Sequence, residues 1–269
     1  MTDLADREWR LIPEASHRGP VNMALDEVAA GTAADGGPRT LRVYRWDPST
    51  LSLGYRQDPA TVDWAHCEDS GVTVTRRPTG GGGIYHDAVG DISYTIVAPA
   101  EEVPGDLLDA YDLLCTPIMD AFERMGVDAR FVTEERPALY EPACYLRALH
   151  PAHDVVGPDG RKLAGNAQYR RKDAVIQHGS LTFRSRPAAH LSVFADPGVT
   201  PAEFAERVGS IEEYAGCSRE AAVSALEGAL GDWADAALGA WTDDELARAR
   251  ELAGEKYESA AWTRERTAP

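Results

Sequence analysis

The chain has 269 residues, enough for one large domain, or one domain with a small appendage, around a sizeable core. It carries 44 Asp and Glu against 27 Lys and Arg, and this acidic balance excludes a general nucleic-acid binder and a protein that docks on anionic membranes. No apolar run approaches the roughly 20 residues of a spanning helix, and the N-terminal stretch MTDLADREWR lacks a signal-peptide pattern, so we expect a cytoplasmic protein.

Lysine is scarce in this chain, occurring only at Lys162, Lys172 and Lys256, while arginine supplies the other positive charges. An acidic, lysine-poor surface suits a protein that stays soluble in concentrated salt, where charges are screened within about 3 Å at 1 M. A halophile-like surface and an acidic protein from a GC-rich genome both fit this composition, and refolding as a function of KCl separates them.

The four cysteines are Cys67, Cys115, Cys144 and Cys217. They lack metal-ligand spacing, so we expect reduced thiols and no protein-borne metal site.

Strand patterns dominate the first two-thirds of the chain. Alternating and β-branched residues predict strands at 9–12, 40–46, 51–55, 72–75, 92–97, 129–132, 153–156, 161–170 and 174–183. Apolar residues three and four apart predict helices at 20–35, 59–70 and 107–125. Asp26 and Glu27, on the first helix, are expected to face solvent. The elements together predict a mixed α/β (α+β) fold, built on a largely antiparallel β-sheet flanked by helices.

The composition changes near Pro187, after which the chain is rich in Ala, Glu and Asp. Helical segments are predicted at 202–208, 219–238 and 242–257. We therefore divide the chain at about residue 195, into a main domain of residues 1–194 and a small helical C-terminal region of residues 195–269. No Ser/Gly linker marks this boundary.

The central stretch from Val72 to Val97, VTVTRRPTGGGGIYHDAVGDISYTIV, predicts a strand, a glycine loop and a second strand. The loop contains four glycines: Gly80, Gly81, Gly82 and Gly83. No side chain there keeps the backbone from a ligand, and successive N–H groups can bind an anion. A glycine-rich hairpin would use the same glycines. Arg76 and Arg77 before the loop and the pair His86-Asp87 after it favour an anion site.

The stretch RRPTGGGGIYHDAVGDISYT resembles the signature of the lipoate–protein ligase family, which is related to biotin protein ligases and octanoyltransferases. Three further stretches resemble the same family: NMALDEVAA (Asn22–Ala30), WDPSTLSLGYRQ (Trp46–Gln57) and GRKLAGNAQYRRKDAVIQHGSL (Gly160–Leu181). They span most of the first two-thirds of the chain in the expected order. The resemblance implies a biotin/lipoate protein ligase-like catalytic domain over residues 1–194, with the mixed fold predicted above.

The resemblance also implies roles for individual residues. Lys162 lies in GRKLAGNAQ, and the matching lysine of the ligases contacts the activated carboxyl and the α-phosphate. Arg76, Arg77 and the four glycines would then hold the adenylate phosphate. The other expected pocket residues are Tyr85, His86, Asn166, Gln168 and His178. His178 fits a core histidine satisfied by backbone equally well.

Cys144, in PACYLRALHPAHDVV, leaves a second activity open. A family of octanoyltransferases carries a nucleophilic cysteine at about this place, with a lysine nearby to lower its pKa. The glycine loop argues for the ligases, because those transferases tend to carry an arginine after two glycines and to lack the GD of HDxxGD. Cys144 is also compatible with an inert thiol.

We therefore expect a lipoate–protein ligase that uses ATP with Mg²⁺ to convert lipoate to lipoyl-AMP. The acyl group would pass to a lysine of lipoyl acceptor domains, such as those of 2-oxoacid dehydrogenase E2 or the glycine cleavage H protein, and a separate accessory ligase subunit could be required. The alternatives are an octanoyltransferase that acts through a Cys144 thioester and a binding protein that keeps the pocket without turnover.

Overall fold

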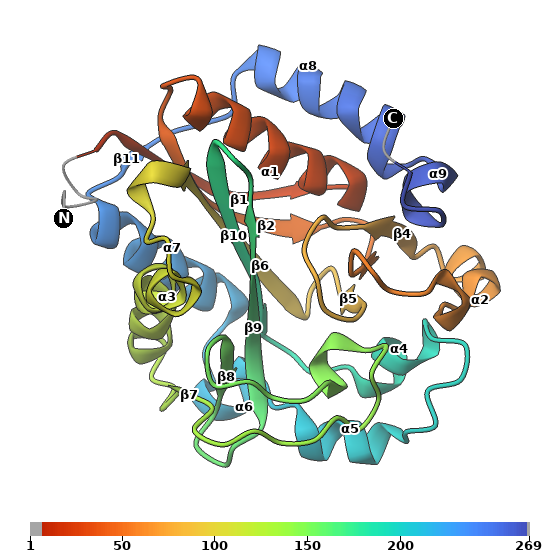
Figure 1. Cartoon of the computed structure of the whole chain (residues 1–269). Helices are drawn as coiled ribbons and strands as arrows, with labels where there is room; N and C mark the ends of the chain where they lie inside the picture. Colours follow the sequence, from red (N-terminus) through yellow and green to blue (C-terminus); the bar gives the residue numbers. More distant parts are fainter. Residues whose placement is uncertain (1–6, 268–269) are drawn as a thin grey trace.

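The computed structural model describes residues 7–267, so most of the N-terminal stretch without a signal-peptide pattern lies outside the described residues. The strands of the main sheet are β1 (Trp9–His17), β2 (Arg39–Trp46), β6 (Asp91–Pro99), β7 (Arg130–Phe131), β8 (Asp154–Val156), β9 (Lys162–Arg170), β10 (Ala174–Thr182) and β11 (Ala237–Leu238). They form an eight-stranded sheet in the order β11-β1-β2-β6-β10-β9-β8-β7 (Figure 1). Among the described strands of this sheet, only the pairs β11–β1 and β1–β2 are parallel. The predicted fold class, a mixed and largely antiparallel sheet flanked by helices, is confirmed.

A second, three-stranded sheet carries the glycine loop. Its strands are β3 (Thr50–Leu53), β4 (Thr73–Arg76) and β5 (Ile84–His86), with β3 in the middle. The glycine loop joins β4 to β5, whereas the predicted second strand, β6, belongs to the main sheet. The loop is therefore no simple hairpin, because β4 and β5 both pair with β3 and not with each other.

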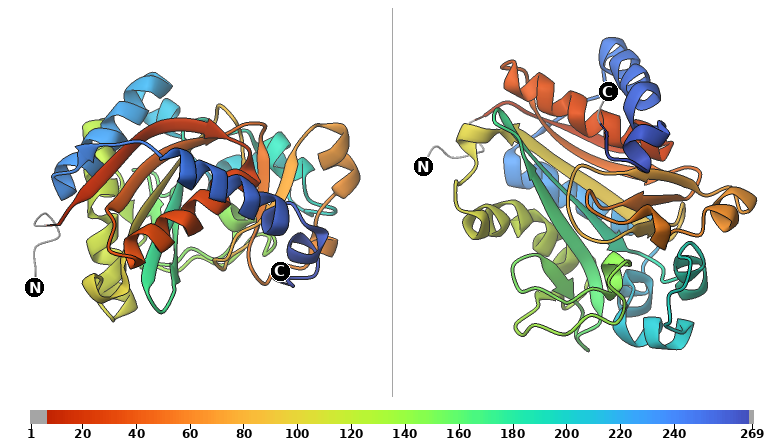
Figure 2. Two further views of the ribbon diagram at one scale, coloured as in Figure 1. Left: turned by 90° about the horizontal axis from the view of Figure 1, so that it is seen from above. Right: turned by 45° about the vertical axis from the view of Figure 1, so that its right-hand side comes forward.

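Helices cover both faces of the main sheet. They are α1 (Gly19–Ala34), α2 (Trp64–Asp69), α3 (Leu107–Arg124), α4 (Pro187–Ser192), α5 (Pro201–Arg207), α6 (Ile211–Ala215), α7 (Arg219–Ala234), α8 (Asp243–Leu252) and α9 (Ala260–Thr263). Short helical turns are η2 (Pro59–Thr61), η3 (Ala100–Glu102), η4 (Cys144–Leu146) and η5 (Ala253–Tyr257). Helices α3 and α7 pack together on one face, and α1 with α8 covers the other (Figures 1 and 2).

The alternation along β6 explains this layering. Ile92, Tyr94 and Ile96 enter the apolar core that includes residues of α3 and α7. Val97 points to the opposite face, where it packs with alanines of α1. Ser93 lines a cavity on that second face. A strand with one apolar face and one mixed face thus separates the main core from the cavity.

Two predictions about helices are wrong. The predicted helix at 59–70 is interrupted, because Val62 is extended and forms a β-bridge with Phe194, so that Asp63 caps a new helix through the backbone N–H of His66. Asp26 does not face solvent: it is buried, and its Oδ1 lies 3.0 Å from Nε of Arg42. A carboxylate on the covered face of α1 is retained there because a buried arginine pairs with it.

The C-terminal region packs against the rest of the chain. Leu226 and Leu230 of α7 belong to the same core as β1, β2 and β6, and β11 extends the main sheet beside β1. Tyr257 and Trp262 enter a cluster with α1 and β2. The boundary at residue 195 stays a prediction. No helix among residues 7–267 is both long enough and apolar enough to cross a membrane.

Candidate active site

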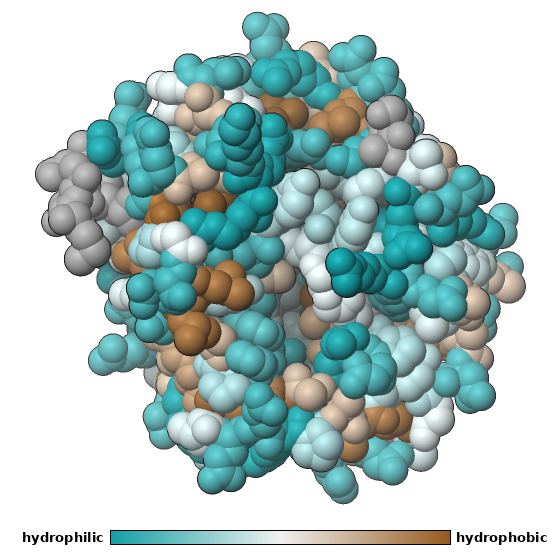
Figure 3. All heavy atoms as spheres, in the orientation of Figure 1, coloured by the Kyte–Doolittle hydropathy of each residue, from teal (hydrophilic) through white to brown (hydrophobic). Residues whose placement is uncertain are grey.

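A cavity of about 410 Å³ lies between the α1 face of the main sheet and the glycine loop. It opens as a hollow near the middle of the face seen in Figure 3, within a largely hydrophilic surface. The predicted site residues that line it are Arg77, Gly80, Gly81, His86, Cys144, Lys162, Asn166, Gln168 and His178. These residues come from both sheets and from the irregular segment before β8, and the fold brings them together.

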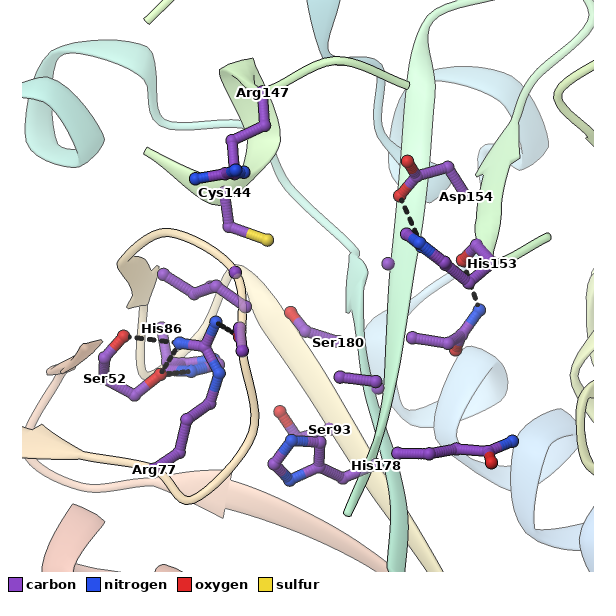
Figure 4. A pocket seen from close by; sticks show the side chains of 18 of the residues that line it. Ser52, Arg77, His86, Ser93, Cys144, Arg147, His153, Asp154, His178 and Ser180 are labelled. Carbon is purple, nitrogen blue, oxygen red and sulfur yellow. Dashed lines mark hydrogen bonds and ion pairs between the residues drawn. The ribbon is translucent and has the colours of Figure 1, made fainter. Parts of the chain in front are cut away.

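Cys144 begins η4, and the glycine loop fixes its backbone. Its N–H donates to the carbonyl oxygen of Gly83 at 2.8 Å, and the N–H of Gly83 donates to Pro142 at 2.7 Å. The thiol is half-buried, and its sulfur points into the cavity (Figure 4). A Cβ built on Gly81 would lie 3.8 Å from Sγ of Cys144, so the loop passes directly beside the sulfur. The cysteine and the glycine loop are parts of one site.

A β-bulge aims Lys162 into the same cavity. Val156 pairs with Lys162 and Val155 with Ala164, so Leu163 is an extra residue on β9. Leu163 and Ala164 both enter the apolar core, whereas Lys162 and Gly165 both line the cavity. In a regular strand, residues three apart face opposite sides, and the bulge removes this constraint.

The ammonium of Lys162 is buried and paired. Its Nζ lies 2.7 Å from Oδ1 of Asp154 and 3.4 Å from the carbonyl oxygen of Cys144. Burial alone would lower the pKa of Lys162, but Asp154 and the nearby sulfur of Cys144 outweigh it and raise this pKa. Although burial opposes it, the pairing with Lys162 holds the pKa of Asp154 well below its usual range. Lys162 is therefore a fixed cation beside Cys144.

Arg77 holds the glycine loop from inside. Its Nη2 donates to the carbonyl oxygens of Gly80 and Gly82, each at 2.7 Å, and its Nη1 donates to that of Ser52 at 2.8 Å. Burial lowers the pKa of Arg77, and the sulfur of Cys144 acts in the opposite direction. Since its Nε also donates to Thr79, each guanidinium nitrogen is already engaged with the protein, and Arg77 shapes the loop.

Arg76 lies outside the cavity and ties the C-terminal region to the base of the loop. Its side chain is fully buried. Nε and Nη2 donate to the carbonyl oxygen of Thr263 at 3.0 and 2.8 Å, and Nη1 donates to Gly54 at 2.7 Å and Gln57 at 2.9 Å. The indole N–H of Trp262 donates a hydrogen bond to the carbonyl oxygen of Arg76. Neither arginine has a guanidinium nitrogen free for the predicted phosphate, because both donate to carbonyl and hydroxyl groups of the chain.

His86 is buried in the cavity wall, as the resemblance implied, but its partner is not the adjacent Asp87. Its Nδ1 is bonded to Asp91, its Nε2 lies 2.9 Å from Oγ of Ser52, and its ring stacks on Trp46. Burial lowers the pKa of His86 although Asp91 opposes this, which favours the neutral ring. Because Ser52 also bonds to Arg77, His86 braces the loop.

The remaining predicted residues divide into two groups. His178 lies in the cavity wall, with Nε2 2.8 Å from Oγ1 of Thr79, and Asn166 donates to the carbonyl oxygen of His153 at 2.9 Å. Gln168 donates to Gln177 at 2.9 Å. The other group does not line the cavity: Arg76, Gly82, Gly83 and Tyr85.

Sequence reasoning missed two carboxylates, Asp91 and Asp154, that organise the site. Asp91 is the aspartate of the GD dipeptide, and it also accepts a bond from Ser180 at 2.7 Å. Asp154 lies on β8, which pairs with the strand of Lys162. Both strands were predicted and only a short turn separates them, so the sequence could have indicated that Asp154 lies near Lys162. Among the described residues, no group of three or more His, Cys, Asp and Glu side chains could hold a metal ion.

Comparison with curated proteins identifies octanoyltransferases as relatives. Octanoyltransferase LipM of Anoxybacillus flavithermus is 30% identical over 275 residues, covering 94% of this chain and 97% of that protein. Octanoyltransferase LipM of Geobacillus kaustophilus is 30% identical over 282 residues, covering 96% of this chain and 99% of that protein.

These relatives contradict the prediction of an ATP-dependent lipoate–protein ligase. They cover nearly the whole chain, including the cysteine segment, and carry the name of the alternative activity. The predicted ATP and Mg²⁺, and lipoate as the substrate that ATP would activate, are contradicted with it. The run of glycines and the GD of HDxxGD were misleading, because they favoured the ligases while the relatives are octanoyltransferases. In the structure the loop is held by Arg77 and by the Cys144 segment.

Solved structures agree on the fold. A lipoate-protein ligase A bound with ATP matches with a TM-score of 0.78 and 23% identity, covering 96% of this chain and 98% of that one. The bi-partite lipoate protein ligase of Thermoplasma acidophilum matches with a TM-score of 0.78 and 23% identity, covering 96% of each chain. The family model of the lipoyl protein ligase A/B catalytic domain matches residues 18–231. The resemblance seen in the sequence is confirmed, and the chain belongs to the lipoyl protein ligase A/B catalytic domain family.

Proposed function

We propose that this enzyme is an octanoyltransferase that works through a thioester on Cys144. It takes an octanoyl chain from the thioester of an acyl carrier protein and passes it to a lysine amine of a lipoyl acceptor domain. The observation that carries the proposal is the position of Cys144, whose sulfur faces the cavity beside the buried cation of Lys162. The names of the relatives support the same activity.

The first step is a thioester exchange. The Cys144 thiolate attacks the carbonyl carbon of the octanoyl thioester, the bond to the carrier's sulfur breaks, and the carrier leaves as a thiolate that takes a proton from water. Nζ of Lys162 lies 3.4 Å from the carbonyl oxygen of Cys144, and the guanidinium of Arg77 lines the same cavity, so two positively charged side chains surround the site where the sulfur reacts. The apolar and aromatic part of the cavity wall, including Met23, Tyr44 and Trp46, suits an alkyl chain.

The second step forms an amide. The neutral amine of the acceptor lysine attacks the acyl-Cys144 carbonyl, the carbon–sulfur bond breaks, and Cys144 is released as a thiolate while the amine nitrogen loses a proton to water. The acceptor is the lipoyl domain of a 2-oxoacid dehydrogenase E2 or the glycine cleavage H protein. An accessory subunit and the cytoplasmic location stay predictions.

The test compares two complete reactions on one acceptor domain: octanoyl carrier protein without ATP, and lipoate with ATP. We expect transfer only in the first, with an octanoyl adduct on Cys144 seen by mass spectrometry. Cys144→Ser should abolish adduct and transfer, because a hydroxyl with a much higher pKa cannot replace the thiolate. Cys217→Ser, at a half-buried free thiol outside the cavity lining, is the matched control and should retain both. Transfer that persists in Cys144→Ser would refute the proposal.

A further inference from the structure

The amide-forming step of the proposed function needs a proton acceptor. A lysine amine is an ammonium at neutral pH, since its ordinary pKa is about 10.4, and only the neutral amine attacks a carbonyl. Lys162 cannot take this proton. It is already held as an ammonium 2.7 Å from Asp154, and Asp154 together with the Cys144 sulfur raises its pKa against the effect of burial.

Two of the histidines that line the cavity are committed elsewhere. His86 uses Nδ1 for Asp91 and Nε2 for Ser52, and its side chain is buried. His178 has Nε2 2.8 Å from Oγ1 of Thr79, with Nδ1 turned toward Asp26 at 3.6 Å. Neither ring offers a nitrogen to a substrate without breaking a buried contact.

His150 is excluded by its tautomer. Its Nδ1 accepts a hydrogen bond from the backbone N–H of Ala152 at 3.1 Å. A neutral imidazole whose Nδ1 accepts must carry its proton on Nε2, so the outward nitrogen is a donor and not a base.

His153 has the opposite arrangement. Its Nδ1 faces Oδ1 of Asp154 at 3.7 Å, longer than a hydrogen bond but close enough for the carboxylate to attract a proton placed on Nδ1. This favours a proton on Nδ1 and leaves Nε2 as the basic nitrogen. No hydrogen bond within residues 7–267 uses that Nε2, and 34% of the side chain is exposed. Stacking on His150 at 5.0 Å and contact with Tyr111 at 5.4 Å fix the plane of the ring.

A chain of contacts links His153 to the nucleophile. The carbonyl oxygen of Cys144 meets Nζ of Lys162, Lys162 pairs with Asp154, and Asp154 faces His153. Figure 4 shows the sulfur of Cys144 on one side of the cavity and His153 with Asp154 on the facing side. One carboxylate thus orients both the cation beside the sulfur and the ring across from it.

We propose that His153 is the general base of amide formation. Nε2 of His153 takes the proton that converts the acceptor ammonium to the neutral amine, and the imidazolium returns this proton to water. The amine then attacks the acyl-Cys144 carbonyl, the carbon–sulfur bond breaks to give the thiolate, and the acidic nitrogen of the adduct releases its second proton to water. The thioester exchange that loads Cys144 involves no amine and does not require this base. The inference therefore separates the two halves of the reaction and rests on the proposed function.

The test measures the two half-reactions separately in wild-type enzyme and His153→Gln, with His66→Gln on α2 as the control. Loading of Cys144 from octanoyl carrier protein should stay within about twofold in His153→Gln. Single-turnover transfer to the acceptor domain should fall about 10²–10³-fold, so that acyl-enzyme accumulates. Release of the acyl group by hydroxylamine should be unchanged, because that nucleophile is already neutral near pH 7. The His66→Gln control should match wild type throughout.

The pH profile gives an independent readout. Wild-type transfer should fall on the acidic side as an imidazole gains its proton, and His153→Gln should lose that limb. The titratable groups of the described residues that contact His153 are Asp154, His150 and Tyr111, and Lys162 lies behind Asp154; the variant keeps all of them. Equal losses toward the acceptor domain and hydroxylamine would reveal a structural role and overturn the inference, as would unchanged transfer. A wild-type enzyme that forms no Cys144 adduct would overturn the proposed function as well.

Discussion

Nζ of Lys162 lies 2.7 Å from Oδ1 of Asp154, and both side chains are almost fully buried. The second oxygen of Asp154 accepts the backbone N–H of His150 at 2.8 Å, so the carboxylate is held from two sides. Burial without this partner would drive Lys162 toward the neutral amine. The pair therefore keeps a positive charge next to Cys144.

Asp154→Asn should slow the loading of Cys144 by about 10²-fold, because removing a preorganised charge partner of the reacting centre typically costs this much. The amide cannot raise the pKa of Lys162, and burial then lowers it, so the ammonium is lost at a lower pH than in wild type. The alkaline limb of the loading rate should move to lower pH. Asp159→Asn, at an exposed carboxylate in the turn before β9, is the matched control and should behave as wild type. An unchanged pH profile in Asp154→Asn would contradict this account of Lys162.

Arg77→Lys should loosen the glycine loop while keeping the charge. A lysine presents one ammonium in place of the planar fork that reaches Ser52, Gly80 and Gly82 together. We expect a loss of about 2–4 kcal/mol in the free energy of unfolding, and faster hydrogen exchange at Gly83, whose N–H is bonded to Pro142. Arg56→Lys, at an exposed arginine near the same loop, should change neither quantity. Wild-type exchange in Arg77→Lys would mean that the Cys144 segment alone holds the loop.

Arg10 and Glu245 form an ion pair that joins β1 to α8. Because of this pair, we expect the free energy of unfolding to decrease in acid. Burial would raise the pKa of Glu245, but hydrogen bonds from Arg10 and from the N–H of Thr242 outweigh it and lower that pKa to about 2. A carboxylate whose pKa is lowered by folding stabilises the protein at every pH above its ordinary pKa of about 4.5. This stabilisation is lost as the pH falls from that value toward about 2.

Glu245→Gln should therefore cost about 2–3 kcal/mol at neutral pH and flatten the decline of unfolding free energy between about pH 4.5 and pH 3. Chemical denaturation across this range measures both effects. Glu258→Gln removes a more exposed partner, that of Arg18, and should cost less than about 1 kcal/mol. Equal slopes for wild type and Glu245→Gln would show that another carboxyl governs the acid limb.

Local patterns were enough for most elements of the fold. The strands β6, β9 and β10 and the helix α3 follow from alternation and from three-and-four spacing, because local periodicity records which face of an element is buried. The two residues with the clearest chemistry, Cys144 and Lys162, were also found from the sequence, and the structure brings them to one cavity. The family was recognised from the same stretches and is confirmed.

What failed were assignments that depend on distant partners. Arg76 and Arg77 are adjacent in the chain, and nothing local distinguishes them. Arg76 binds Thr263, 187 residues away, whereas Arg77 turns toward the loop beside it. Asp26 was expected in solvent because its partner Arg42 lies on another element.

The sequence by itself determined the family, the mixed sheet and the presence of a cysteine, a lysine and a glycine loop, because these depend on residue type and local spacing. Only the tertiary structure decided that the loop passes beside the Cys144 sulfur, that a bulge at Leu163 aims Lys162 at the cavity, and that Asp154 serves both Lys162 and His153. The physical reason is that a buried charge takes its properties from the groups packed against it. Those groups come from strands whose pairing the local pattern does not specify.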